Sequence, residues 1–124
     1  MRYVRAKLVW PSDPADTPYV FDLLLDANER IIGNWPIFGV SGGVRGDASY
    51  PFVLGSEDQI DYGVGCEGRY RFERTNLRER LIRIGEYVTI WNADDEEWAY
   101  RVQEIIDLTQ LAQRHTPISA DASH

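Results

Sequence analysis

The sequence predicts a small, mainly β domain built from antiparallel hairpins, and three observations favour this fold class. Short runs rich in β-branched and aromatic residues recur along the chain. Turn residues separate these runs at short spacing, so successive strands can pair as hairpins. No repeat, linker or low-complexity tract divides the 124 residues, an ordinary length for one compact domain.

The beginning of the chain is expected to form one strand and then a loop. Residues 2–10 contain Val4, Leu8 and Val9, which supply the apolar content of a strand. Residues 11–18 hold three prolines and two aspartates, which favour a loop without regular structure.

A β-hairpin is predicted next, with strands at residues 19–25 and 30–35 and a turn near Asn28. A helix over residues 19–32 is the alternative. It would place Asn28 on the same face as the apolar residues Leu24 and Ile31. Because that face would not be apolar enough to pack on a core, the hairpin is favoured.

Residues 39–68 are predicted to be the least regular part of the chain, because they contain eight of its ten glycines. Within them, residues 50–54 form an apolar island that is expected to pack on the core. A functional loop, if the protein has one, is expected in this segment.

Residues 69–73 alternate as in a half-buried strand, with Tyr70 and Phe72 facing the core and Glu73 among the solvent-facing residues. The next segment is ambiguous, because residues 76–84 fit either a helix with a capping box or an extended chain. We expect a short helical turn or loop near residues 76–80, followed by extended chain.

The clearest hairpin has strands at residues 87–91 and 97–102, and its second strand places Trp98, Tyr100 and Val102 on one face. A short helix is predicted at residues 105–114. The domain is expected to span residues 1–116.

Residues 117–124 are small and polar, and are expected to form a flexible tail.

These elements amount to about six or seven strands, which predicts a mainly β (α+β) fold with one short C-terminal helix. The expected architecture is a small antiparallel barrel or a curled sheet. Residues 83–90 and the tight hairpin after them are similar to strands of SH3-like barrels. This is a likeness of architecture and defines no family.

Charge and composition narrow the classes of partner. The formal charge is −7, from 13 basic and 20 acidic residues, which disfavours nucleic acid and favours a protein with a basic surface. No apolar run approaches the roughly 18 residues of a membrane span. Cys66 is the single cysteine, so no intramolecular disulfide can form.

With no signal-peptide pattern at the N-terminus, a cytoplasmic location is expected.

No motif predicts a catalytic residue, a metal site or a cofactor. Residues 63–68 match G-x-G-x-x-G, but the next residues alternate as a strand where a dinucleotide site needs a helix, so a glycine turn is predicted. Cys66 and His115 could form a nucleophilic pair, yet His115 lies near the expected tail. Close pairs of soft metal ligands, which a zinc site requires, do not occur.

Two groups of residues are the candidate sites. The hairpin tip and its aromatic residues could bind a partner: Asp94, Asp95, Glu96, Glu97, Trp91 and Trp98. The glycine-rich segment could build a pocket from Tyr50, Phe52, Tyr62 and Cys66.

Three hypotheses about function follow. The first is a protein-binding module of the immunity, inhibitor or adaptor type, supported by the acidic charge and the aromatic content. The second is a small-ligand binder or enzyme with a pocket near residues 39–68. The third is a structural subunit of a larger bacterial or phage assembly, in which edge strands pair with neighbours.

Overall fold

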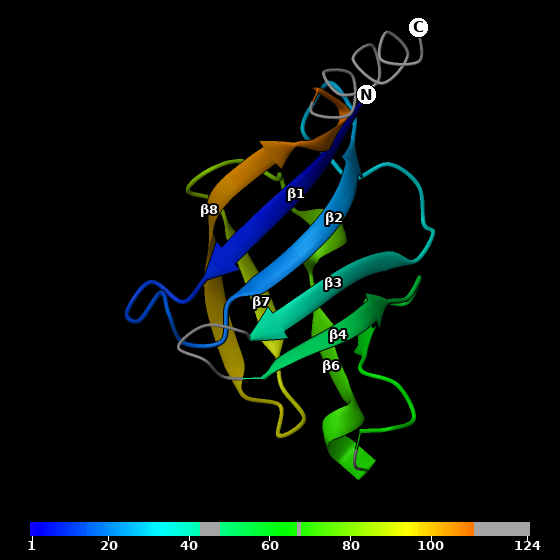
Figure 1. Cartoon of the computed structure of the whole chain (residues 1–124), viewed down its shortest axis with the longest axis vertical. Helices are drawn as coiled ribbons and strands as arrows, with labels where there is room; N and C mark the ends of the chain where they lie inside the picture. The colour runs from blue at the N-terminus through cyan, green and yellow to red at the C-terminus, as the bar shows by residue number, and fades with distance from the viewer. Residues whose placement is uncertain (43–47, 67, 111–124) are drawn as a thin grey trace, which may run out of the picture.

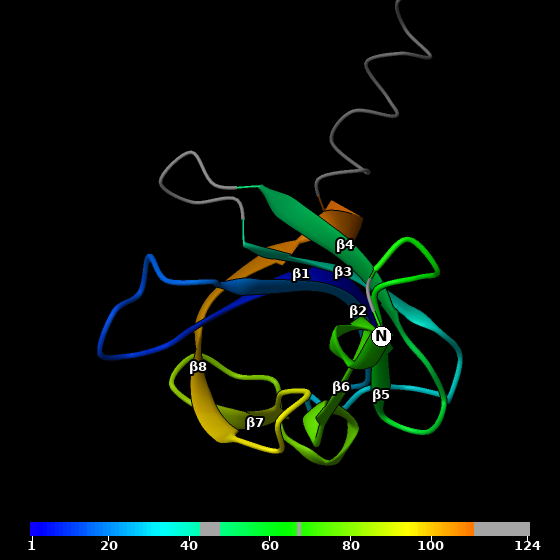
Figure 2. The same ribbon diagram turned by 90° about the horizontal axis from the view of Figure 1, so that it is seen from below.

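The protein forms a closed antiparallel β-barrel of eight strands. The computed structural model describes residues 1–42, 48–66 and 68–110. Each strand pairs with its neighbour in sequence, and the last strand returns to pair with the first (Figure 1). Viewed along the barrel, the strands form a ring (Figure 2). The predicted mainly β fold, built from hairpins, is therefore confirmed.

The strands are β1 (Arg2–Val9), β2 (Tyr19–Leu25), β3 (Ile37–Gly42), β4 (Ser49–Leu54), β5 (Gln59–Asp61), β6 (Phe72–Thr75), β7 (Tyr87–Trp91) and β8 (Glu97–Asp107). Two 3-10 turns accompany them, η1 (Gly68–Arg71) and η2 (Leu77–Glu79). The turn η2 confirms the helical turn predicted near residues 76–80. The described helical segments include none with the length and apolar character that crossing a membrane requires.

The prediction that residues 39–68 are irregular was wrong, because β4, β5 and most of β3 lie there. Gly39 shows why glycine is compatible with a strand at this position. A Cβ atom on Gly39 would lie 2.4 Å from Cζ of Phe52, its partner on β4. The missing side chain therefore makes room for an aromatic ring inside the barrel.

The hairpin expected over residues 19–35 is present in a reduced form. Its turn is fixed by Asp26, whose Oδ1 accepts hydrogen bonds from the backbone N–H groups of Asn28 and Arg30. The returning arm makes only one bridge, between Leu25 and Ile31, and is not a strand. Instead β3 forms the extended partner of β2.

The helix predicted from Ile105 begins later, because β8 continues to Asp107 and residues 108–110 are helical. A bulge explains the error. The pairing register between β1 and β8 shifts there, so Gln103 and Glu104 are both exposed while Val102 and Ile105 turn inward. The inward residues Val102 and Ile105 are consequently three positions apart, which is the spacing of apolar residues in a helix. Residues 111–114, and the proposed tail boundary at residue 117, lie outside the described residues.

The interior is apolar along most of its length and is closed at one end. The segment between β6 and β7 covers that end and places Leu77 and Ile82 in the core, where both are fully buried. Arg78 connects this segment to the rest of the barrel, because its Nη2 donates to the carbonyl oxygens of Trp35, Leu54 and Gly55. The opposite end of the barrel carries the polar interior residues.

Candidate ligand-binding site

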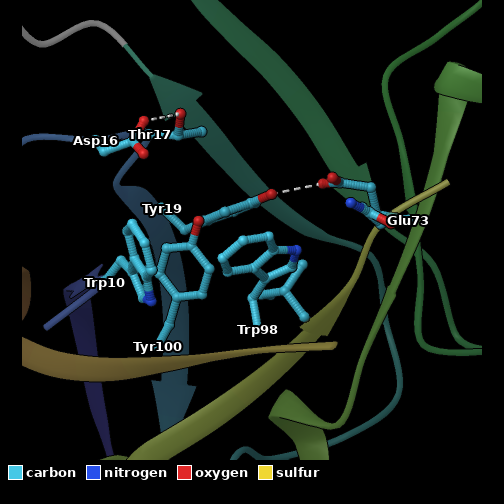
Figure 3. A pocket seen from close by; sticks show the side chains of 9 residues that line it. Trp10, Asp16, Thr17, Tyr19, Glu73, Trp98 and Tyr100 are labelled. Carbon is cyan, nitrogen blue, oxygen red and sulfur yellow. Dashed lines mark hydrogen bonds between the residues drawn. The ribbon is translucent and has the colours of Figure 1, made fainter. Parts of the chain in front are cut away.

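A pocket of about 220 Å³ occupies the barrel end at which β1 and β7 finish and β2, β6 and β8 begin (Figure 3). Four aromatic rings and two carboxylates dominate its wall. The lining residues are Trp10, Asp16, Thr17, Tyr19, Glu73, Ile90, Asn92, Trp98 and Tyr100. Its residues come from five separate segments of the chain, so only the closed barrel assembles them.

Glu73 faces the interior, which corrects the prediction that it lies on the solvent face. It stands opposite the fully buried Ile60, and Thr75 stands opposite the buried Ile90. Because paired residues share a face, the inward positions of β6 are Glu73 and Thr75. Residues 68–71 form the turn η1 and not a strand. The predicted alternation of inward and outward residues ran through this turn, and it therefore assigned Glu73 to the wrong face.

Tyr70 and Phe72, which the same alternation had placed toward the core, lie elsewhere. Tyr70 belongs to η1 and is 55% exposed. Phe72 is on the outer side of β6, where the guanidinium carbon of Arg71 lies 4.8 Å from its ring centroid.

A chain of hydrogen bonds fixes the Glu73 carboxylate. The hydroxyls of Tyr19 and Tyr62 both donate to its Oε1, each at 2.7 Å. The Ser41 Oγ lies 3.0 Å from the Tyr62 hydroxyl. Because the Tyr62 proton is directed at Glu73, Ser41 is the donor in this last bond. Within the described parts of the chain, no basic side chain forms an ion pair with Glu73.

The environment keeps the three interior phenols protonated. Burial raises the pKa of Tyr19 and that of Tyr62 far above the ordinary phenol value, and the nearby Glu73 charge raises both further. Burial raises the pKa of Tyr100 to about 12, with contributions from the charges of Glu73 and Asp16. All three residues are therefore hydrogen-bond donors at neutral pH.

Tyr100 is only 8% exposed, yet its hydroxyl makes no hydrogen bond to any of the residues that the structure describes. Its ring packs edge-on against Tyr19, with centroids 4.9 Å apart. The hydroxyl oxygen is open to the pocket rather than sealed in the core. The Tyr100 hydroxyl is thus a group that a bound molecule can satisfy.

Two tryptophans form an aromatic wall of the pocket. Trp10 follows β1 and Trp98 belongs to β8, and their rings meet edge to face at 5.2 Å between centroids. Both line the same pocket as Tyr100 (Figure 3). Each is partly buried and packs against the core.

The predicted pocket residues are only partly brought together. Tyr50, Tyr62 and Cys66 line a second, open hollow of about 600 Å³ at the same end of the barrel. Phe52 is 4% exposed and lies in the core, where its ring packs against Tyr62 at 5.6 Å. Tyr62 connects the hollow to the main pocket, because its hydroxyl binds Glu73.

The loop that carries Tyr62 and Cys66 is anchored at its start by Asp61. Arg71 donates to the two carboxylate oxygens of Asp61 at 2.7 and 3.0 Å, and the Gly63 N–H donates at 2.8 Å. The hydrogen bond from Arg71, and then that from Gly63, lowers the pKa of Asp61. The glycine motif at residues 63–68 follows as the connection between β5 and β6, in agreement with the predicted glycine turn.

The predicted partner-binding residues divide between two faces. The tip of the β7–β8 hairpin exposes all four acidic residues, Asp94, Asp95, Glu96 and Glu97. Trp91 lies on the outer face, where its Nε1 donates to Glu97 at 3.0 Å and Arg74 lies 5.0 Å from its ring centroid.

Trp98 instead points into the barrel end and lines the pocket. The two tryptophans therefore do not form one surface.

The nine lining residues include no cysteine or histidine. The described residues also contain no cluster of three or more His, Cys, Asp or Glu that could hold a metal ion. No local pattern indicates Trp10, Tyr19 and Glu73 as site residues, because their proximity depends on strand pairing over long separations.

Fold and site together define a closed β-barrel with an aromatic, negatively charged pocket at its open end. We found no match to this chain among protein-family models, curated proteins or solved structures. The site therefore has to be interpreted from its own chemistry.

Proposed function

We propose that the protein is a small-ligand-binding barrel that holds its ligand in the pocket at the open end. One observation carries the proposal: the Glu73 carboxylate is fixed by two interior phenols but paired with no described basic group. A carboxylate turned into a barrel is costly unless it has partners. Apolar side chains would fill this end of the barrel at a lower cost, so the arrangement supports a role in binding.

The size of the pocket limits the ligand. Pockets for drug-sized molecules usually enclose roughly 300–1,000 Å³, whereas this one encloses about 220 Å³. The occupant is therefore a small molecule or one terminal group of a larger molecule.

A thermal-shift screen of charged and uncharged metabolites tests the proposal. A ligand should raise the melting temperature of the wild-type protein and have a smaller effect on Tyr100→Phe and Trp98→Leu. The matched control is Tyr87→Phe, which changes an exposed tyrosine on the outside of β7. Absence of any hit at millimolar concentration, or equal shifts in all variants, would contradict a ligand site in this pocket.

Protein binding through the acidic hairpin tip is a second candidate function. It is favoured by the exposure of all four tip carboxylates and by their position at the open end of the barrel. A partner with a basic surface could meet the tip and the pocket together.

Neutralising Asp94, Asp95, Glu96 and Glu97 should weaken binding of such a partner and reduce its dependence on salt. A control variant with Glu57, Glu79 and Glu104 neutralised removes exposed charges elsewhere. Equal affinity of the tip variant and the wild type would reject this candidate.

A subunit that assembles by pairing of edge strands gains no support from the fold. Every strand of the closed barrel pairs on both sides, so the described chain has no free edge strand of the kind this hypothesis requires.

A further inference from the structure

We infer that the pocket binds a small organic cation, namely an alkylammonium group, supplied either by a free amine or by a lysine side chain of a partner. The inference rests on the proposed function and specifies its ligand class. Three features of the pocket support it: its charge, its aromatic walls and the open hydrogen-bonding positions that line it.

The charge of the lining is negative. Asp16 and Glu73 contribute two carboxylates, while the nine lining residues include no lysine, arginine or histidine. The acidic hairpin tip, residues 94–97, projects at the same end, and the whole chain has a formal charge of −7. Such a field attracts cations toward the pocket and repels anions.

The aromatic walls suit the same ligand. Trp10, Trp98, Tyr19 and Tyr100 all line the pocket. Aromatic rings attract cations through the negative potential of their faces, tryptophan most strongly, and such walls are used to recognise quaternary ammonium groups. An uncharged apolar ligand could also contact these rings, but it would gain nothing from the charges of Asp16 and Glu73.

The Glu73 carboxylate has one oxygen that can accept a further hydrogen bond. Both phenols donate to Oε1 of Glu73, so Oε2 receives no hydrogen bond from a described residue. The Tyr100 hydroxyl also forms no hydrogen bond within the described chain, and it is open to the pocket. An alkylammonium N–H can donate to Glu73 Oε2. A quaternary ammonium group, which has no N–H, interacts with the carboxylate through its charge alone.

A divalent metal ion fits the pocket less well. Hard metal ions need several oxygen ligands at short range. Within the described residues, no group of three or more metal-binding side chains exists here or elsewhere. An alkylammonium group needs only one carboxylate and the aromatic faces.

Titration of the full-length protein with propylammonium and tetramethylammonium, followed by calorimetry and NMR, tests the inference. The uncharged control compounds have carbon in place of nitrogen and otherwise the same shape. We expect each cation to bind at least tenfold more tightly than its isostere, with an affinity that falls as salt rises. Glu73→Gln should weaken cation binding at least tenfold, and Glu57→Gln, an exposed position away from this pocket, should leave it unchanged.

Glu73→Gln keeps an oxygen that accepts the two phenol hydrogen bonds, and its fold is verified by circular dichroism. If that variant fails to fold, Trp98→Leu replaces it. Loss of the indole face should weaken cation binding, whereas binding of the uncharged isostere should change by less than a factor of two.

The outcomes separate the ligand class from the proposed function. Equal binding of cation and isostere would overturn the cation inference and leave the ligand-binding barrel intact. If neither cation binds at millimolar concentration, the cation inference is overturned as well. The uncharged compounds of the thermal-shift screen would then test whether the pocket binds any ligand. Cation binding that survives in both Glu73→Gln and Trp98→Leu would show that the cation binds elsewhere.

The same titration distinguishes the two sources of the ammonium group. Tighter binding of a lysine-containing peptide than of propylammonium would indicate a side chain of a partner protein. Tighter binding of the free amine would indicate a metabolite.

Discussion

Tyr19 and Glu73 are 54 residues apart in the chain, and the hydroxyl of Tyr19 donates to Glu73 Oε1 at 2.7 Å. Tyr19 begins β2 and Glu73 lies in β6, which are not neighbours in the barrel. This hydrogen bond therefore crosses the barrel interior and connects strands that the ladders do not pair (Figure 3). Tyr62 on the adjacent loop donates to the same oxygen, so one carboxylate organises the open end.

Replacement of Tyr19 by Phe should lower the free energy of unfolding by about 1.5–3 kcal/mol, the usual range for a hydrogen bond to a charged group. The ring remains, so packing against Tyr100 and Phe52 is kept. Urea denaturation measures the change. Tyr62→Phe is the matched variant, and the loss in the double variant should differ from the sum of the single losses if Glu73 couples the two phenols. Strict additivity would contradict this coupling.

Gly39→Ala should destabilise the barrel by about 1–3 kcal/mol, the usual cost of overpacking an interior. The new methyl group would lie 2.4 Å from Phe52 Cζ and 2.6 Å from the backbone oxygen of Val20, and that oxygen cannot move away easily. Chemical denaturation measures the loss. Gly55→Ala is the control, because the nearest atom to its added methyl group is 3.9 Å away. Equal stability of the two variants would contradict the close packing at Gly39.

Stability should fall in alkaline solution as the pH rises above 10. The pKa of Tyr100 is raised by burial from 10.0 to about 12, and burial raises those of Tyr19 and Tyr62 as well. Unfolded chains lose these protons near pH 10 while the folded protein retains them, so the stabilising effect is complete below pH 10 and is lost progressively above it.

Tyr100→Phe removes one of these three groups, so its stability should decline less steeply between pH 10 and 12 than that of the wild type. Denaturation at several pH values, together with phenolate absorbance, measures the effect. Parallel declines in the two proteins would argue against a protected Tyr100.

Arg78→Ala should destabilise the closed end by about 1–3 kcal/mol, the cost of leaving buried acceptors without their donor. The Arg78 side chain is 10% exposed, and its Nε lies 3.4 Å from Asp58 Oδ1 without forming a hydrogen bond there. The variant leaves Asp58 without this partner and removes the hydrogen bonds to three backbone carbonyls.

The control for Arg78→Ala is Arg74→Ala. Arg74 lies 3.4 Å from Asp95, but both side chains are largely exposed, so its loss should cost at most about 1 kcal/mol. Thermal and urea unfolding compare the two variants. Similar small losses in both would show that the closed end does not depend on Arg78.

The sequence alone determined the features that depend on local patterns. The hairpin of residues 87–102 was predicted correctly, because β-forming runs on both sides of a polar turn specify strand pairing over a short separation. The inward set Trp98, Tyr100 and Val102 followed from simple alternation, which also placed two members of the pocket on one face. The fold class followed from the repetition of such runs.

Tertiary structure alone decided the phase and the neighbours of these elements. The turn η1 before β6 turned Glu73 inward, and the bulge at Gln103 and Glu104 extended β8 where helical spacing had suggested a helix. Barrel closure then brought Tyr19 and Trp10 to Glu73 and Trp98. Strand alternation has a period of two, so a single irregular residue reverses the face of every residue after it. Pairing between strands far apart in the chain cannot be predicted from the spacing of residues within one strand.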